Sequence, residues 1–388
     1  MKSLKEFDIK NKRVLVRCDF NVPLDRKGEQ AEVSDDFKIK ESLATIEYLI
    51  REGAKVILMS HLGRPKKGEN LSLRPVALKL KELLKKNVKF SKDCLGKETE
   101  KEIAGMKAGE VMLLENLRFH EEEEAGDLDF AGRLAELGDI YINDAFGASH
   151  RSHASIVGIT KFLPSGAGFL LQKEVEALSR ILNDPERPLV AVIGGAKIET
   201  KIMVIKTFLE KADHLLLGGK IANSVLAIKG IWLFGEPMPA EAVKEIKKID
   251  LTSIKLHLPV DILVSPVDFG KDGIRQSALA GVEKDELLLD IGQETINIFS
   301  KIIKEARTIV WSGPLGLSEN PLFENGTKET ALAIAGNRQA FKVAGGGETA
   351  QFINKTGLKE KFDHLSTGGG AMLEFLSDRK FPGIEALE

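Results

Sequence analysis

The chain has 388 residues, of which 43% are hydrophobic and 29% are charged, and its formal net charge is −2. This composition excludes a disordered chain, and the near-zero charge argues against general binding to nucleic acid or to a membrane surface. No uncharged stretch reaches the roughly 18 residues that a spanning helix needs. The length predicts two or three domains. The two cysteines, Cys18 and Cys94, are expected to be reduced and buried, as in a cytoplasmic protein.

Short apolar runs recur along the whole chain and predict strands. They lie at residues 14–16, 56–59, 111–114, 140–142, 189–193, 215–217, 262–264, 309–311 and 341–344. Stretches with helical spacing separate most of them, such as 76–86 and one in which Ile39, Leu43, Ile46 and Ile50 share a face. Strand followed by helix, repeated many times, predicts an α/β fold with mainly parallel sheets.

Basic residues follow the predicted strands of the first half. Five of them lie at the end of a predicted strand or just after it: Arg17, His61, Arg64, Arg118 and Arg151. Ligands of open α/β sheets bind at the carboxyl ends of the strands, so these cations could surround one anion. Asp19 and Asn21 could bind its hydroxyl groups. For any single arginine, an ordinary surface ion pair is the alternative interpretation.

Glycine-rich turns follow the strands of the second half. GGAKIETK at 194–201 opens a predicted helix on which Lys197 and Lys201 would share one face. GGGET at 345–349 and STGGGA at 366–371 repeat this design. Backbone N–H groups at helix starts, with two ammonium groups, indicate a phosphate site, and Glu348 could help to hold Mg²⁺. The alternative is a set of tight turns followed by surface lysines, with Glu348 as a favourable charge at a helix start.

Basic side chains follow the predicted strands in the first half, whereas glycine-rich backbone follows them in the second half. This contrast predicts two domains. The join is expected near 172–188, where a predicted helix at 172–182 is followed by a break with two prolines. The acidic run at 121–124 is expected to be solvated surface.

Other motifs give weaker signals. No P-loop is present, and His150 and His153 are too little for a metal site. One competitor is a nicotinamide-dependent dehydrogenase, because Gly345, Gly347 and Ala350 fit a dinucleotide fingerprint with Asp363 beyond it. That hypothesis leaves the basic residues and the other glycine turns unexplained.

The motifs taken together resemble those of the phosphoglycerate kinase family from about residue 13 to residue 383. In chain order they are RCDFNVPL at 17–24, SHLGRP at 60–65, LLENLRF at 113–119, NDAFGASHRSHAS at 143–155, GGAKIETK at 194–201, DIGQET at 290–295, WSGPLGLSE at 311–319, GGGET at 345–349 and STGGGA at 366–371. So many long motifs in the family's order make a specific match.

The resemblance implies two doubly wound, Rossmann-like parallel-sheet domains joined by a hinge helix. The triose-phosphate domain would be 1–171, the interdomain helix and linker 172–187, and the nucleotide domain 188–374, with a tail at 375–388 packing back on the first. It implies reversible phosphoryl transfer between 1,3-bisphosphoglycerate and MgADP, giving 3-phosphoglycerate and MgATP. ATP or ADP and Mg²⁺ would be the cofactors, and we expect a cytoplasmic monomer that binds neither nucleic acid nor membrane.

The resemblance also assigns residues. The triose-binding set is Asp19, Phe20, Asn21, Lys38, His61, Leu62, Gly63, Arg64, Arg118 and Arg151, with Arg17 lining the same region. The nucleotide-side set is Lys197, Lys201, Glu319 at the ribose hydroxyls, Gly346, Gly347, Glu348 and Thr349, with Glu348 as the metal ligand. Lys38, Lys197 and Lys201 would be catalytic, since the transfer needs positioning and charge stabilisation rather than a protein nucleophile. Our hypothesis is that domain closure brings the Lys38 side to the Lys197 side and excludes water.

Four positions depart from the family pattern. Lys38 replaces the family's catalytic arginine, and Glu348 replaces its metal-binding aspartate. Ser312 replaces an asparagine, and Lys220 replaces a glycine. Lysine keeps the charge of arginine but lacks its planar fork. The departures leave a second hypothesis, a relative that binds nucleotide or triose phosphate with weakened catalysis.

Overall fold

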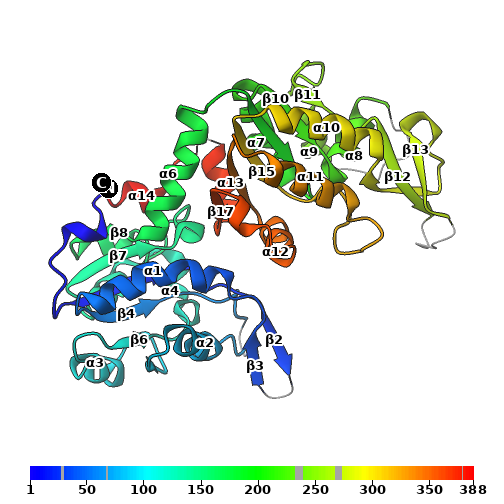
Figure 1. Cartoon of the computed structure of the whole chain (residues 1–388). Helices are drawn as coiled ribbons and strands as arrows, with labels where there is room; N and C mark the ends of the chain where they lie inside the picture. The colour runs from blue at the N-terminus through cyan, green and yellow to red at the C-terminus, as the bar shows by residue number, and fades with distance from the viewer. Residues whose placement is uncertain (28–29, 67–68, 232–238, 267–272, 378) are drawn as a thin grey trace. The chain divides into compact units, whose positions relative to one another are not determined.

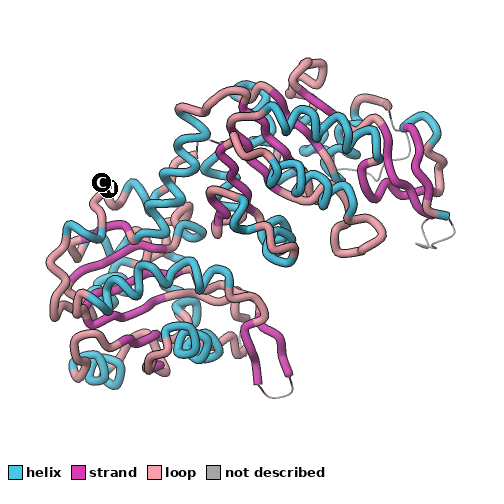
Figure 2. Tube along the Cα trace, in the orientation of Figure 1, coloured by secondary structure: helices cyan, strands magenta, loops and turns pink. Residues whose placement is uncertain are grey.

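The computed structural model describes residues 1–27, 30–66, 69–231, 239–266, 273–377 and 379–388. Contacts between Cα atoms divide the chain into two compact units, Met1–Glu176 with Lys380–Glu388, and Ala177–Arg379. The division falls inside helix α6 (Phe169–Asn183). Each unit contains a six-stranded parallel sheet with helices between the strands, which confirms the predicted fold class (Figures 1 and 2).

The sheet of the first unit contains all the runs predicted in that half. Its strands, in spatial order, are β5 (Val88–Phe90), β6 (Val111–Leu113), β4 (Lys55–Met59), β1 (Arg13–Cys18), β7 (Ile140–Asp144) and β8 (Ser165–Ala167). The central strands are apolar because both faces of the sheet are covered, and Val14, Val56 and Ile142 are fully buried. Strands β5 and β8 have only three residues each and escaped prediction, because neither is a continuous apolar run.

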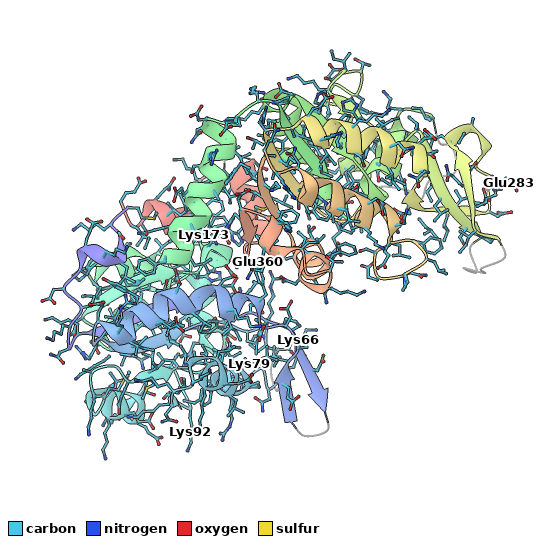
Figure 3. The ribbon with its side chains drawn as sticks, viewed as in Figure 1. Lys66, Lys79, Lys92, Lys173, Glu283 and Glu360 are labelled. Carbon is cyan, nitrogen blue, oxygen red and sulfur yellow. The ribbon has the colours of Figure 1, made fainter. Side chains whose placement is uncertain are left out.

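Helices of the first unit cover this sheet. They are η1 (Leu4–Glu6), α1 (Phe37–Arg51), α2 (Arg74–Leu84), α3 (Lys97–Ala104), η2 (Leu117–Phe119), α4 (Glu121–Ala125), α5 (Leu128–Ala135), η3 (Phe146–Ala148), η4 (Gly158–Lys161) and α14 (Pro382–Glu385). Helix α1 begins after Asp36 and buries Ile39 and Ile46, as its spacing predicted. Charged side chains such as Lys92 point outward (Figure 3). None of the described helices is long and apolar enough to cross a membrane.

Residues 380–388 pack on the first unit. The Gly383 N–H donates to the Ser149 carbonyl at 2.9 Å, and the Phe381 ring stacks on Phe146 with centroids 5.6 Å apart. A separate antiparallel hairpin is formed by β2 (Leu24–Lys27) and β3 (Gln30–Val33).

The sheet of the second unit repeats the parallel design. Its strands, in spatial order, are β11 (Leu256–His257), β10 (His214–Leu217), β9 (Leu189–Ile193), β15 (Thr308–Ser312), β16 (Phe341–Gly345) and β17 (His364–Ser366). The helices are α7 (Ile202–Lys211), α8 (Gly219–Ile228), α9 (Ala240–Ile246), α10 (Gln293–Glu305), α11 (Asn325–Gly336), α12 (Gly347–Lys355) and α13 (Gly370–Leu376), with short turns η5 (Ile198–Thr200), η7 (Leu279–Gly281) and η8 (Lys359–Lys361). Trp311 of β15 is fully buried in this unit.

The predicted strand at 262–264 does not join the parallel sheet. It forms the middle of an antiparallel sheet in the order β13 (Arg275–Ala278), β12 (Asp261–Pro266) and β14 (Glu286–Ile291). Ile262, Val264, Val282 and Leu288 form a small apolar cluster of their own. A short apolar run cannot by itself distinguish a parallel from an antiparallel strand.

The structure corrects the prediction that the acidic run 121–124 is solvated throughout. Glu121, Glu122 and Glu124 are exposed, but Glu123 is fully buried in helix α4. A buried carboxylate needs charge and hydrogen-bond partners, and Arg17 and Ser155 provide them. Cys18 and Cys94 are free and buried, as predicted.

Candidate active site

The predicted basic residues of the first unit follow four adjacent strands of its sheet. Arg17 is the penultimate residue of β1, His61 follows β4, Arg118 lies after β6, and Arg151 lies after β7. The carboxyl ends of these parallel strands meet at one edge of the sheet. We call Arg17, His61, Arg64, Arg118 and Arg151 the basic cluster.

Electrostatic interactions show that the cluster converges. Burial lowers the pKa of the Arg118 guanidinium, and the charges of Arg151, Arg17 and Arg64 lower it further. Arg118 donates to the Gly63 carbonyl at 2.6 Å and pairs with Glu124 at 2.9 Å. Its buried Nε has no hydrogen-bond partner among the described residues. Arg64 is exposed and Arg151 is half-buried, so both remain accessible.

Arg17 and His61 form the buried part of the cluster. The Arg17 side chain is fully buried, and its Nη2 lies 3.2 Å from His61 Nδ1. Burial lowers the pKa of His61 well below its usual value, and the neighbouring charge of Arg17 adds to this effect. His61 is therefore neutral near pH 7.

Asp19 and Lys38 form an ion pair beside the cluster, with 2.8 Å between Lys38 Nζ and Asp19 Oδ2. Burial raises the pKa of Asp19, but the charge and hydrogen bond of Lys38, together with the charges of His61 and Arg17, outweigh it, and the net pKa falls to about 2. Asp19 is therefore an anion that holds an ammonium group at this edge of the sheet.

The remaining predicted triose-side residues shape the loops. The Gly63 N–H donates to Asn21 Oδ1 at 2.9 Å, and the Phe20 N–H donates to Ser60 Oγ at 2.8 Å. The side chains of Phe20 and Leu62 belong to the hydrophobic core, so only their backbone is available to a ligand.

Sequence reasoning missed the residue that holds the loop at 60–64. The fully buried Asn116 accepts from the Leu62 N–H at 3.1 Å and donates to the Leu62 carbonyl at 2.9 Å. A lone asparagine after a strand carries no sequence signal for this role, because its partners come from a distant loop.

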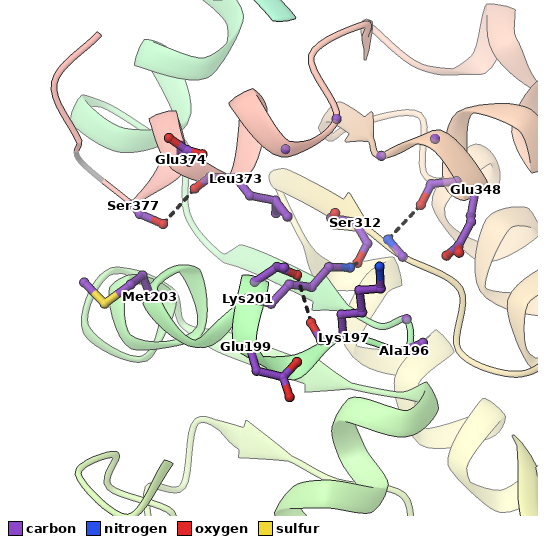
Figure 4. Close-up of a pocket in the computed structure, with 18 of the residues that line it drawn as sticks. Ala196, Lys197, Glu199, Lys201, Met203, Ser312, Glu348, Leu373, Glu374 and Ser377 are labelled. Carbon is purple, nitrogen blue, oxygen red and sulfur yellow. Dashed lines mark hydrogen bonds between the residues drawn. The ribbon is translucent and has the colours of Figure 1, made fainter. Parts of the chain in front are cut away.

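The second unit has a pocket of about 650 Å³ (Figure 4). Its walls are the loop after β9, the end of β15 and the starts of α12 and α13, so four adjacent strands lead into it. The predicted residues that line it are Lys197, Lys201, Gly346, Gly347, Glu348 and Thr349. Glycines of the 366–371 turn also line it, as the phosphate interpretation expected, and Ser312, a departure from the family pattern, lines it too.

Lys201 bridges the ends of two strands in this pocket. Its Nζ donates to the carbonyls of Gly194, at 2.5 Å, and Ser312, at 3.0 Å. Burial lowers the pKa of Lys201 to about 8, and the nearby charge of Glu348 acts in the opposite direction. Lys197 is exposed and extends toward the same part of the pocket (Figure 4).

The prediction that Lys197 and Lys201 share one face of a helix is wrong. Residues Ile198–Thr200 form the 3₁₀ turn η5, and α7 begins only at Ile202. Both lysines nevertheless line one pocket, because Lys197 lies directly before the turn and Lys201 directly after it.

The start of α12 has the geometry of an anion site. Gly346 precedes the helix with φ of +106°, a conformation that favours glycine. The Thr349 hydroxyl accepts from the Gly313 N–H at 2.7 Å, which ties this helix to the end of β15. Glu348 lies in the first turn and is exposed to the pocket.

Three residues singled out in the sequence lie elsewhere. Glu319 is exposed in the loop after β15 and is not among the described residues that line the pocket, and Lys220 is exposed at the start of α8. Asp363 accepts from the Lys342 N–H at 2.8 Å at the amino end of β17. It therefore lies away from the carboxyl ends, where a dinucleotide would need its acidic partner.

Comparison with known proteins gives one consistent result. The family model described as phosphoglycerate kinase matches residues 4–379. The phosphoglycerate kinase of Dictyoglomus turgidum is 45% identical over 402 residues, covering 99% of this chain and 98% of that protein. That of Moorella thermoacetica is 47% identical over 393 residues, with the same coverage of 99% and 98%.

Solved structures agree with the sequence comparisons. Phosphoglycerate kinase from Coxiella burnetii has a TM-score of 0.83 at 36% identity. Phosphoglycerate kinase from Pyrococcus horikoshii has a TM-score of 0.89 at 34% identity. Each comparison covers 100% of this chain and 98% of the other.

Proposed function

The chain belongs to the phosphoglycerate kinase family, and from this premise we propose that its first unit binds the triose phosphate and its second unit binds the nucleotide. The reaction of this phosphotransferase is the reversible transfer of a phosphoryl group between 1,3-bisphosphoglycerate and MgADP, which yields 3-phosphoglycerate and MgATP. One observation carries the division of substrates: the strand ends of the first unit present arginines, whereas those of the second present glycines and lysines around a pocket.

The basic cluster suits a triose that carries a phosphate and a carboxylate. Arg64, Arg118 and Arg151 can each offer a planar fork that matches either group. Arg118 Nε is a buried donor without a partner among the described residues, and a ligand oxygen would satisfy it. Asn21 and Asp19 lie beside the cluster and can bind hydroxyl groups.

The pocket of the second unit suits the phosphates of a nucleotide. The first turn of α12 has backbone N–H groups without intrahelical partners, and Lys197 and Lys201 supply positive charge. The donor set also fits Mg²⁺, because Glu348 is an exposed carboxylate next to the expected phosphates. When bound, the metal would neutralise charge on the phosphate oxygens. Glu319 stays a prediction at the ribose.

The proposed catalytic role of the protein is to position the two substrates and to stabilise charge on the transferring phosphoryl group. The attacking oxygen belongs to a carboxylate or a phosphate, so no protein base is required. Lys201 keeps one N–H for a ligand, because two of its three donors bind the carbonyls of Gly194 and Ser312. Lys38 is anchored by Asp19 and can direct its other donors to the transferring group.

Isothermal titration of variants tests the division of substrates. We expect Arg64→Ala to weaken binding of 3-phosphoglycerate about tenfold and leave MgADP binding unchanged, since one charge-assisted hydrogen bond is lost. Lys197→Ala should do the reverse. The exposed residues Arg133 and Lys244, replaced by alanine, are matched controls. Weakening of both ligands by either variant would contradict the assignment.

We also propose that the protein acts as a cytoplasmic monomer. Two free, buried cysteines fit a reducing compartment. Light scattering coupled to gel filtration tests the oligomeric state, with a mass near 42.6 kDa expected.

A further inference from the structure

We propose that Glu123 and Ser155 are positioning residues for triose binding: they hold Arg17 so that Arg17, in turn, makes His61 present its Nε2–H to the ligand. The inference rests on the proposed assignment of the basic cluster to the triose. It gives Arg17 a different role from the one expected from the sequence, in which it lines the binding region.

Each of the three side-chain nitrogens of Arg17 donates to a protein partner. Its Nε donates to Ser155 Oγ at 2.8 Å, its Nη1 to the Cys18 carbonyl at 2.5 Å, and its Nη2 to His61 Nδ1 at 3.2 Å. The residue has no exposed surface. With these bonds in place, Arg17 has neither a free fork nor access to a ligand, so its influence must pass through His61.

The hydroxyl of Ser155 has only one possible orientation. Arg17 Nε can only donate, so Ser155 Oγ accepts, and the Ser155 hydrogen is left for Glu123 Oε1 at 2.6 Å. The other oxygen of Glu123 accepts from the Ser155 N–H at 2.9 Å. Ser155 is thus a relay between the carboxylate and the guanidinium.

Glu123 supplies the charge that allows Arg17 to be buried. It has no exposed surface, and its Oε1 lies 3.8 Å from Arg17 Nη2. A buried guanidinium without a counter-charge would be strongly unfavourable. The Tyr141 hydroxyl donates to the Ser155 carbonyl at 2.7 Å and fixes the segment from the other side.

The contact with Arg17 determines the tautomer of His61. A guanidinium has no acceptor, so His61 Nδ1 must accept the hydrogen bond, and the ring proton must lie on Nε2. Burial and the Arg17 charge keep the ring neutral by lowering its pKa. The other charged groups that act on His61 are Asp19, Arg118 and Lys38. No hydrogen bond among the described residues uses Nε2, so its N–H is available for an anion.

The tautomer can be measured without substrate. Two-dimensional ¹H–¹⁵N correlation spectra of the imidazole rings, with His61→Gln for assignment, should show the Nε2–H form in the wild type at pH 7.5. Ser155→Ala keeps both buried charges and removes only the relay, and it should produce a mixture of tautomers. A wild-type ring protonated on Nδ1, a doubly protonated ring, or an unchanged tautomer in Ser155→Ala would each overturn the inference.

Kinetics provide the second readout. Ser155→Ala should raise the KM for 3-phosphoglycerate about tenfold and leave the KM for MgATP within about twofold, because one hydrogen bond to a charged group is lost. Ser155→Thr, which keeps the hydroxyl, should have a KM for 3-phosphoglycerate close to that of the wild type. Ser152→Ala and Glu122→Gln are matched controls, since both side chains are exposed in the same segments. Equal rises in both KM values, or no rise, would overturn the positioning role.

The two experiments separate this inference from the proposed function. A wild-type protein that fails to convert 3-phosphoglycerate with MgATP would contradict the proposed function, and the tautomer spectra would still test the network. Glu123→Gln serves as a further variant only if its circular dichroism matches the wild type, because removing this charge leaves Arg17 unpaired.

Discussion

The two units present positive charge at the same position in the same kind of sheet, but they do so with different parts of the chain. In the first unit, the loops after β6, β4, β1 and β7 carry cationic side chains. In the second, the loops after β9, β15, β16 and β17 carry glycines, and Lys201 donates to two backbone carbonyls. Both sites lie where the strand order reverses direction, which is where open α/β sheets bind ligands.

Cationic side chains and glycine turns make different demands on the rest of the fold. Side-chain cations need counter-charges when they are buried, and the first unit supplies Glu123 for Arg17, Glu124 for Arg118 and Asp19 for Lys38. A glycine turn needs no counter-charge, because its N–H groups carry only partial charge. It needs close approach of backbones instead: a side chain at Gly194 or Gly313 would collide with the opposite loop.

The largest expected effect is the loss of Lys201, a cation that is buried in the pocket of the second unit. Lys201→Ala should lower kcat by about 10²–10³-fold, as for removal of a donor to developing charge, with the KM for 3-phosphoglycerate within about twofold. A coupled assay that follows NADH oxidation through a dehydrogenase measures both.

Lys244→Ala, an exposed lysine of the same unit, is its control. A loss of less than threefold would show that the glycine turns suffice without this lysine, and the contrast between the two units would become sharper.

The corresponding change in the first unit is Arg118→Ala. It removes the fork whose Nε is buried without a partner, so the KM for 3-phosphoglycerate should rise about 10²-fold while the KM for MgATP stays constant. The same assay, with 3-phosphoglycerate varied, provides the measurement. Arg133→Ala is the control, since Arg133 is exposed on α5. Were both KM values to rise alike, the separation of substrates between the units would be wrong.

The sequence predicts this contrast well because strands and the residues that follow them are local features. The runs at 14–16 and 189–193 are strands β1 and β9, and the types of residue after them mark the two sites. The burial of Glu123 is not predictable in the same way, because its partners, Arg17 and Ser155, are distant in the chain. Four consecutive glutamates look like solvated surface until the fold brings a buried guanidinium beside one of them.

Lys197 and Lys201 illustrate a second limit. Their common pocket was predicted, but from a helical spacing that the chain does not adopt, since η5 replaces the first turn of the helix.

The antiparallel sheet around β12 illustrates a third limit. Its apolar residues have the same pattern as a parallel strand, and only the partner strands distinguish the two.

The dependence on pH should differ between the units. The pKa of Lys201 is lowered to about 8, so kcat/KM for MgATP should fall about tenfold per pH unit above that value as the ammonium loses its proton. At saturating MgATP the negative charge of the bound nucleotide should keep Lys201 protonated, and the arginines stay charged, so kcat/KM for 3-phosphoglycerate should lack this decline. Rate profiles between pH 6 and pH 10 provide the measurement.

Glu348→Gln sharpens this prediction. The Glu348 charge raises the pKa of Lys201, so its removal should move the decline to lower pH. Glu360→Gln, an exposed acid of the same unit, should leave the profile unchanged. An unchanged midpoint in Glu348→Gln would mean that another group is responsible for the decline.

The smallest expected effect is on stability and concerns His153, which lies 3.7 Å from Glu123. Burial, followed by the charges of Arg17 and Arg118, lowers the pKa of His153 to about 3. The unfolded chain binds this proton near pH 6.5, so the free energy of unfolding should fall as the pH decreases below that value. The loss should be about 1–2 kcal/mol at pH 5, and His153→Gln should remove it.

Urea titrations at pH 7.5 and pH 5 can assign this loss to one unit. Both tyrosines, Tyr48 and Tyr141, belong to the first unit, and both tryptophans occur within residues 177–379, so ¹⁹F spectra of fluorotyrosine-labelled protein and tryptophan fluorescence report on the units separately. The tyrosine signal should show the loss, and His153→Gln should reduce it only there. An equal loss in His153→Gln would shift the cause to His61, a second buried imidazole of the first unit with a lowered pKa, and would show that the acid sensitivity of this unit lies in its binding cluster itself.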